Sequence, residues 1–168
     1  MKIHRQDIEV GWHSEITIRH KTDTHHFSEG HHSRLFKKFV NIQSKDKDSW
    51  WVDGGDLLDA DRPSLRDRKK IMYSDRKEAW TQDDKQSMAL IDKEIIPLYL
   101  PIKDRCLGMI DGDHYAIYSN GMTSTEYIAR KLGVPYLGER MAFIGLVFKN
   151  PGGQKCRYTI LLLSLIHI

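Results

Sequence analysis

The sequence predicts an α/β fold in which a largely parallel sheet is flanked by helices. Segments with strand-like composition alternate along the chain with segments that carry a helical apolar stripe, and this alternation is typical of parallel strands joined by helical crossovers. Glycine and aspartate follow several predicted strands, at the strand ends where open α/β sheets carry their functional loops. The chain has 168 residues, enough for one domain with a hydrophobic core.

The first half of the chain contains two predicted strands and one predicted helix. Residues 15–21 alternate apolar and polar side chains and are rich in β-branched residues, which indicates a strand. Residues 35–40 place apolar side chains at i, i+1, i+4 and i+5, the stripe of an amphipathic helix. Residues 49–52 predict a second strand. The charged segment 59–70 includes a proline, and we expect a surface loop there.

The second half of the chain continues the alternation and ends in a hairpin. Residues 81–98 have one apolar helical face, and residues 105–111 form an apolar run that predicts a third strand. A capping box at 123–126 predicts the start of another helix. Residues 142–148 and 157–162 are predicted to pair as two strands, because an Asn-Pro-Gly-Gly turn lies between them.

Composition points to a cytoplasmic protein with no membrane partner. The formal net charge is only +3, which is too small to indicate nucleic-acid binding on electrostatics alone. Cys106 and Cys156 lie in apolar runs without the spacing of a metal or disulfide motif, so we expect reduced thiols. The N-terminus lacks the apolar core of a signal peptide, and no apolar run reaches the roughly 20 residues that cross a bilayer.

Acidic and histidine side chains follow each of the three predicted strands. Asp23 and His25 follow the first, Asp56 the second, and Asp113 and His114 the third. Since adjacent strands lie about 5 Å apart, we expect these side chains to meet in one pocket. Crowded carboxylates repel each other unless a cation lies between them, and mixed Asp and His ligands suit Mn, Fe or Zn.

These motifs resemble those of the calcineurin-like metallophosphoesterases, especially phage and bacterial members. The family pattern runs D-x-H, G-D-x-x-D and G-N-H followed by an acidic residue. This chain has Asp23-Thr-His25, Gly55-Asp-Leu-Leu-Asp59 and Gly112-Asp-His-Tyr115 in the same order. The resemblance covers about residues 15–162, and it implies an incomplete form of the family's four-layer α/β/β/α sandwich.

The resemblance implies hydrolysis of phosphate esters, monoesters or diesters, including nucleotides or nucleic acids, at two divalent metal ions such as Mn, Fe or Zn. Asp23 and His25 would bind the first ion, and Asp56 would bridge both. Asp113 would bind the second ion in place of the family's asparagine. Its additional negative charge should tighten metal binding and weaken the attraction for phosphate.

Two further roles are implied by the resemblance. His114 would be the catalytic imidazole that protonates the leaving group or stabilises charge on the phosphate. Asp59 would orient the metal ligands from behind them. Tyr115 stands where the family has an acidic residue.

The family's later histidine motifs, a lone His and G-H-x-H, have no counterpart in this sequence. The last six residues, 163–168, match the translation of a common sequencing adapter. We therefore expect residues 1–162 to be the N-terminal part of a single, C-terminally truncated metallophosphoesterase domain, followed by a non-native tail. We also expect this fragment to have little or no activity.

Each motif also has a plainer interpretation as a polar turn, and two other functions fit parts of the sequence. One is a non-catalytic nucleic-acid-binding or phage accessory module, using the basic segment 62–70 with Trp50 and Trp51. Its binding would weaken steeply with salt and would not respond to metal. Trp50 and Trp51 are, however, more typical of packing residues beside a sheet.

The other alternative is a simple histidine metal site. Its four histidines fall within eight residues: His25, His26, His31 and His32. In that case Asp56→Asn would leave metal affinity unchanged, whereas the phosphoesterase hypothesis predicts a large loss.

Overall fold

The computed structural model describes residues 2–58 and 77–164. The predicted surface loop 59–70, with Asp59 and the basic segment 62–70, lies outside the described residues. The elements are β1 (Lys2–Glu9), β2 (Thr17–Lys21), α1 (Ser33–Lys45), β3 (Ser49–Asp53), α3 (Lys77–Leu90), η1 (Ile91–Ile95), α4 (Ile96–Tyr99), η2 (Leu100–Arg105), β4 (Cys106–Ile110), α5 (Ser124–Leu132), β5 (Tyr136–Gly138), β6 (Met141–Lys149) and β7 (Lys155–Leu163).

The fold is α/β, with a parallel four-stranded sheet in the order β2-β3-β4-β5. Every neighbouring pair in this sheet is parallel, so the ends of β2, β3 and β4 meet at one edge. A second sheet of three strands has the order β1-β6-β7. In it β1 is parallel to β6, and β6 and β7 form the predicted antiparallel hairpin.

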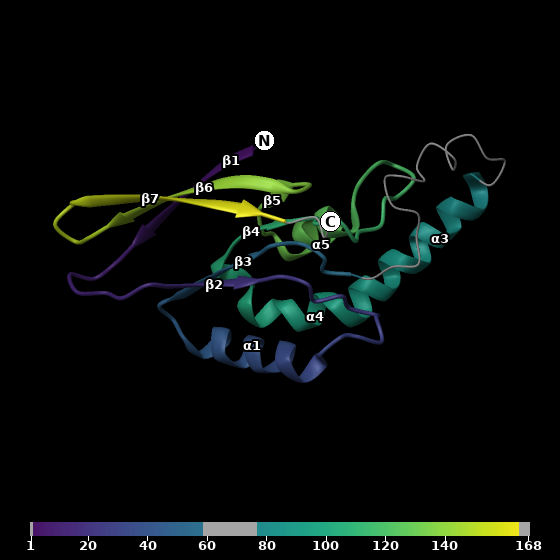
Figure 1. Cartoon of the computed structure of the whole chain (residues 1–168), viewed down its shortest axis with the longest axis horizontal. Helices are drawn as coiled ribbons and strands as arrows, with labels where there is room; N and C mark the ends of the chain where they lie inside the picture. Colours follow the sequence, from purple (N-terminus) through teal and green to yellow (C-terminus); the bar gives the residue numbers. More distant parts are fainter. Residues whose placement is uncertain (1, 59–76, 165–168) are drawn as a thin grey trace.

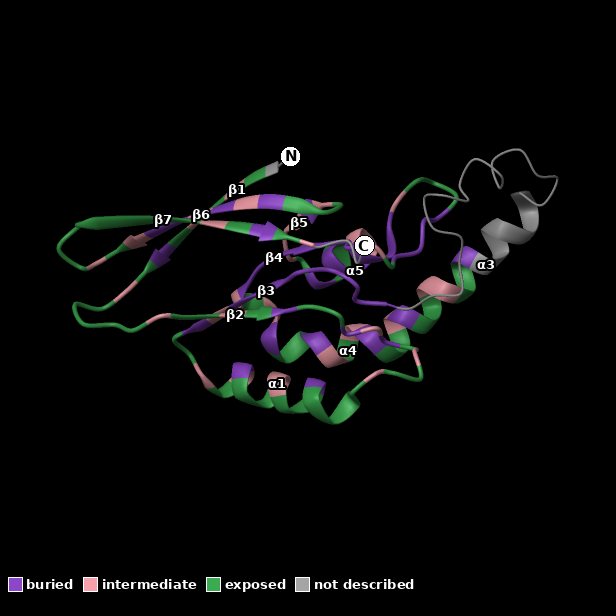
Figure 2. Ribbon diagram, viewed as in Figure 1, coloured by how far each residue is buried: buried purple, intermediate pink, exposed green. Residues whose placement is uncertain are grey.

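The two sheets and the helices form three layers (Figure 1). The helices α1 and α4 lie on one side of the four-stranded sheet, and the three-stranded sheet lies on the other. One apolar core packs side chains of the helices, such as Phe36 and Ile95, against Trp51 of β3. The other packs Ile144 of β6 against Leu107 of β4 between the two sheets. The strands β3 and β4 are therefore buried almost throughout (Figure 2).

The sequence predicts the elements around the candidate site well. The strands predicted at 15–21, 49–52 and 105–111 correspond to β2, β3 and β4. The capping prediction is also confirmed, because the Thr123 side chain accepts a hydrogen bond from the Glu126 N–H at 3.0 Å. α5 then ends at Gly133, which has the left-handed φ of 71° that glycine adopts readily.

The predicted helix 81–98 extends further than its apolar face indicates. It begins at Lys77, passes through the π-helical turn Ile91–Ile95 and continues through α4 to Tyr99. Pro97 has no N–H to donate to the carbonyl four residues earlier. A local π-turn is one way in which a helix accommodates such an interruption.

Two strands, β1 and β5, are missed by the sequence prediction. In β1 the two isoleucines have opposite parity, so the alternation that marks a half-buried strand does not appear. Ile3 is 78% exposed whereas Ile8 is 4% exposed. β5 has only three residues, too few for a periodic pattern.

Of the residues predicted to form a tail, Leu163 belongs to β7 and pairs with Met141. Residues 165–168 lie outside the described residues, so the domain boundary stays a prediction. Within the described part of the chain, no helix combines the length and the apolar character needed to cross a membrane.

Candidate metal centre

The loops after β2, β3 and β4 are joined to one another by backbone hydrogen bonds. The His25 N–H donates to the Asp56 carbonyl at 2.9 Å, and the Asp56 N–H donates to the Asp111 carbonyl at 2.9 Å. The Asp23 N–H donates to the Gly55 carbonyl at 3.2 Å. The three loops therefore form one connected surface at the strand ends, as the sequence predicts.

Asp23, His25 and Asp56 come together in this surface. Each offers a ligand atom, and these atoms all lie within 4.8 Å of one another. The Asp23 side chain is 49% exposed and that of His25 27% exposed, whereas Asp56 is buried. One imidazole nitrogen and two carboxylate oxygens form a donor set that suits a transition metal.

The backbone at all three residues is left-handed. The φ angles are 52° at Asp23, 45° at His25 and 53° at Asp56. Asp and His adopt this region more often than most residues, yet it still costs about 1–3 kcal/mol at each position. Such cost persists where the surrounding structure imposes it, and here it falls on the three clustered side chains.

The residues present fit a metal ion. Nδ1 of His25 is buried and has no hydrogen-bond partner among the described residues. A buried nitrogen without a partner is unfavourable unless a ligand occupies its lone pair. Nε2 of the same ring lies 3.9 Å from the Asp23 carboxylate, so this nitrogen lies beside one of the clustered carboxylates.

Asp56 is held by the third loop. Its Oδ1 accepts hydrogen bonds from the backbone N–H groups of Asp113 and His114, both at 2.7 Å. These contacts fix the carboxylate at the centre of the three loops. The His114 ring is exposed, and its centroid lies 5.2 Å from that of His25. His114 is therefore beside the cluster and open to a molecule that binds there.

Asp113 is not among the three clustered residues. Its carboxylate forms an ion pair with Arg140, with 2.8 Å between Nη2 and Oδ1. Tyr115 is buried at 6% exposure, so it packs in the interior. Asp59 lies outside the described residues, and its predicted role stays a prediction.

Two buried polar groups beneath the site were not assigned roles from the sequence. Lys21 and Asp53 are register partners at the ends of β2 and β3 and form an ion pair at 2.7 Å, with side chains 7% and 0% exposed. The signal for this pair was a lysine and an aspartate at the last positions of two adjacent strands. The Lys21 Nζ also donates to the Thr24 Oγ1 at 2.6 Å, which ties the loop to the sheet.

Asp111 is the second such group. It is completely buried, accepts a hydrogen bond from the Thr123 hydroxyl at 2.7 Å and another from the Tyr136 hydroxyl. Burial raises its pKa to about 6, although these hydrogen bonds oppose the shift. The sequence signal for this group was an aspartate directly after the apolar run that predicts the third strand.

Among the described residues, the four neighbouring histidines do not come together as one group of possible metal ligands. His26 is buried and its Nε2 lies 3.1 Å from the Tyr99 hydroxyl. Burial, with Lys21 and His31 nearby, lowers the pKa of His26 to about 3. Among the described residues, His25 is the one of these four histidines that belongs to the cluster with Asp23 and Asp56.

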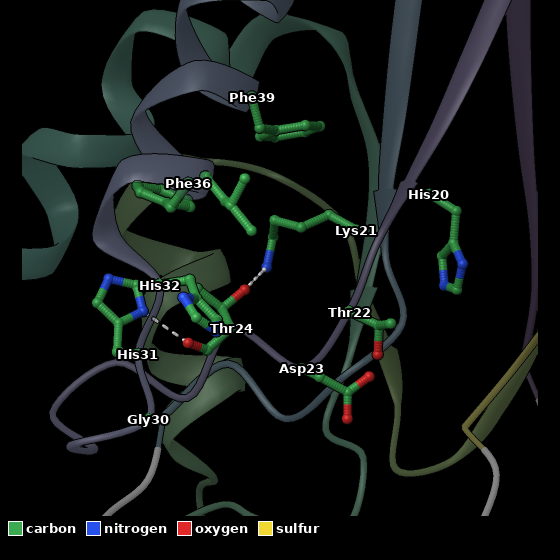
Figure 3. Close-up of a pocket in the computed structure, with 11 residues that line it drawn as sticks. His20, Lys21, Thr22, Asp23, Thr24, Gly30, His31, His32, Phe36 and Phe39 are labelled. Atoms are coloured by element: carbon green, nitrogen blue, oxygen red, sulfur yellow. Dashed lines mark hydrogen bonds between the residues drawn. The ribbon is translucent and has the colours of Figure 1, made fainter.

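A pocket of about 360 Å³ opens beside the cluster, between the end of β2 and the start of α1 (Figure 3). Asp23 lines this pocket, so the pocket and the cluster share a side chain. Nδ1 of His31 donates to the Thr24 carbonyl at 2.7 Å. Phe36 and Phe39 give the pocket an apolar wall.

Comparison of the chain with protein-family models, with curated proteins and with solved structures found no match.

Proposed function

We propose that this protein belongs to the metal-dependent phosphoesterases and that its site hydrolyses phosphate esters with two divalent metal ions. The observation that carries the proposal is the cluster of Asp23, His25 and Asp56, whose ligand atoms lie within 4.8 Å of one another. These residues belong to the motifs that resemble the metallophosphoesterases, and they lie on adjacent strand ends.

Asp23 and His25 would hold the first metal ion, and Asp56 would bridge to a second ion near Asp113. Bound ions of this kind supply Lewis-acid chemistry, which activates water and neutralises charge on phosphoryl oxygens. Asp56 keeps its orientation through the two backbone amides at 2.7 Å. His114 extends into solvent beside the cluster, where it can give a proton to the departing alkoxide.

The layers support the proposed family fold. A helical layer, a parallel sheet and a second sheet correspond to three of the four layers of an α/β/β/α sandwich. The pocket beside Asp23 supports a substrate with an organic group next to its phosphate. Its volume of about 360 Å³ and its apolar wall suit an aromatic or heterocyclic ester group.

Manganese binding to wild-type protein and to the Asp56→Asn variant tests the metal centre. We expect Asp56→Asn to lower Mn²⁺ affinity at least tenfold in calorimetric titrations, because a central carboxylate loses its charge. Asp48→Asn makes the same chemical change at an exposed position and should leave affinity unchanged. Equal affinities in all three proteins would overturn the proposed centre.

Hydrolysis of bis(p-nitrophenyl) phosphate tests the reaction. Turnover should require Mn²⁺, disappear in Asp56→Asn and fall by about 10²-fold or more in His114→Ala. Because the sequence contains no G-H-x-H motif, we expect the wild-type rate to be slow. Hydrolysis that is indifferent to Mn²⁺ and to Asp56 would contradict the proposed mechanism.

A further inference from the structure

Arg140 forms an ion pair with Asp113, the residue that the proposed function assigns to a second metal ion. It belongs to the turn between β5 and β6, and its Nη2 is 2.8 Å from Oδ1 of Asp113. The turn is fixed beside the third loop, because the Gly112 N–H donates to the Glu139 carbonyl at 2.9 Å. The Ser164 N–H donates to the Arg140 carbonyl at 2.9 Å, so the position of Arg140 does not depend on its own side chain.

The ion pair between Arg140 and Asp113 offsets electrostatic repulsion between carboxylates at the site. Asp23, Asp56 and Asp113 follow three adjacent strands, and carboxylates brought to the same sheet edge repel each other unless a cation offsets their charge. Arg140 provides that cation for Asp113. Arginine side chains are cations in proteins. The charge can therefore leave Asp113 only if the side chain moves away.

Building on the proposed two-metal function, we propose that Arg140 controls occupancy of the second metal position. Its guanidinium and the second ion compete for the Asp113 carboxylate. The first position, at Asp23 and His25, does not involve Arg140. The protein should therefore bind one ion tightly and a second ion more weakly, and the gap between the two affinities should depend on the charge of residue 140.

The expected change in affinity for the second ion depends on how far Arg140 and Asp113 are exposed to solvent. The side chains of Arg140 and Asp113 are 46% and 25% exposed, so water screens their attraction. The guanidinium would also repel a divalent ion placed a few ångströms away. Together these effects predict roughly tenfold tighter binding of the second Mn²⁺ when the charge is removed.

The experiment titrates the full 168-residue chain with Mn²⁺ alone and follows it by electron paramagnetic resonance. The signal of free Mn²⁺ gives the number and affinity of bound ions, and a spin-coupled signal reports a pair of adjacent ions. The variants are Arg140→Gln, which removes the charge, and Arg140→Lys, which keeps it. Arg130→Gln is the matched control, because Arg130 pairs with Glu126 on α5.

Arg140→Gln should form the coupled signal at about tenfold lower Mn²⁺ concentration than wild type, with the first affinity unchanged. The Mn²⁺ concentration at which Arg140→Lys forms the coupled signal should remain within about threefold of the wild-type value. Arg130→Gln should form the signal at the same concentration as wild type. An unchanged second affinity in Arg140→Gln, a single bound ion in both proteins, or a change in the first affinity would each overturn the inference.

Failure of the proposed function has a different signature. Wild-type protein would then bind no Mn²⁺, or Asp56→Asn would bind it as tightly as wild type. Thermal unfolding of each variant completes the comparison. The Arg140 side chain is nearly half exposed and its backbone contact remains in every variant, so we expect all of them to fold.

Discussion

Gly55 and Gly112 contact each other backbone to backbone where the second and third loops meet. A Cβ on Gly55 would lie 2.5 Å from the Cα of Gly112, and a Cβ on Gly112 would lie 2.5 Å from the Asp56 nitrogen. Both glycines have left-handed φ angles, 103° and 81°. The glycine before each aspartate is therefore what allows the two loops to approach, and this approach places the Asp113 amide on Asp56.

Gly112→Ala should destabilise the protein and disrupt the proposed metal centre. The alanine would meet the Asp56 backbone and carboxylate in addition to its unfavourable φ. Gly133→Ala is a matched control, since Gly133 has a φ of 71° and nothing within 4 Å of the added Cβ. The control should lose only about 1–2 kcal/mol of unfolding free energy.

We expect Gly112→Ala to lose at least about 1–3 kcal/mol more than the control. Its Mn²⁺ affinity should also fall, whereas that of Gly133→Ala should not. Urea unfolding and calorimetric Mn²⁺ titration measure the two effects. Equal losses of stability in the two variants would show that the contact with Asp56 carries no cost.

Lys21→Met should be strongly destabilising. The substitution leaves the fully buried Asp53 carboxylate without its cation, and an uncompensated buried charge costs about 3–5 kcal/mol. The double variant Lys21→Met/Asp53→Asn removes both charges and should recover part of this loss. Urea unfolding at neutral pH measures the unfolding free energies of wild type, the single variant and the double variant.

Arg130→Met is the comparison for a surface ion pair. Arg130 pairs with Glu126 at 2.7 Å, but its side chain is 70% exposed, so the loss should be below about 1 kcal/mol. Losses of similar size in Lys21→Met and Arg130→Met would contradict the importance of the buried pair.

The convergence of the three loops could be predicted from the sequence because it depends on local patterns. An alternating pattern predicts β2 and apolar runs predict β3 and β4, and parallel strands in sequence order bring Asp23, Asp56 and Asp113 to one edge. The sequence also places Asp56 and Asp113 directly after glycines that permit tight turns. These features require no knowledge of side-chain contacts.

Contacts between distant segments could not be predicted in the same way. The pairing of Arg140 with Asp113 depends on the position of the turn after β5, a strand of three residues. The pairing of β1 with β6 joins residues 140 positions apart, such as Lys2 and Ala142. Neither leaves a periodic signal, because both follow from tertiary packing. The motifs therefore do not reveal that Asp113 pairs with Arg140.

His26 should make the protein less stable as the pH falls below neutral. Its folded-state pKa of about 3 lies below the ordinary value of 6.5, chiefly because of burial. Between these values the unfolded chain gains a proton that the folded protein does not. Stability from His26 is therefore present above about pH 6.5 and is lost as the pH falls toward 3.

His26→Gln removes the titrating group and should flatten this dependence by up to a few kcal/mol between pH 7 and pH 4. The same substitution at the exposed His32 should leave the dependence unchanged. Urea unfolding at several pH values measures the slopes. Parallel curves for wild type and His26→Gln would contradict the prediction.

Asp111 should have the opposite effect in part of the same range. Burial raises its folded-state pKa to about 6, above the ordinary value of 3.8. Between these values the folded protein retains a proton that the unfolded chain has released. Stability from Asp111 is therefore fully present below about pH 4 and is lost as the pH rises toward 6.

Asp111→Asn cannot ionise and keeps an oxygen that can accept from Thr123, so it isolates this effect. The difference in unfolding free energy between Asp111→Asn and wild type should shift in favour of the variant by up to about 3 kcal/mol from pH 4 to pH 7. Asp48→Asn, at an exposed position, should show no such shift. Measured in EDTA, a difference that is independent of pH would contradict the raised pKa of Asp111. Because His26 and Asp111 oppose each other between about pH 4 and 6, the wild-type curve alone would hide both effects, and the single variants are needed to separate them.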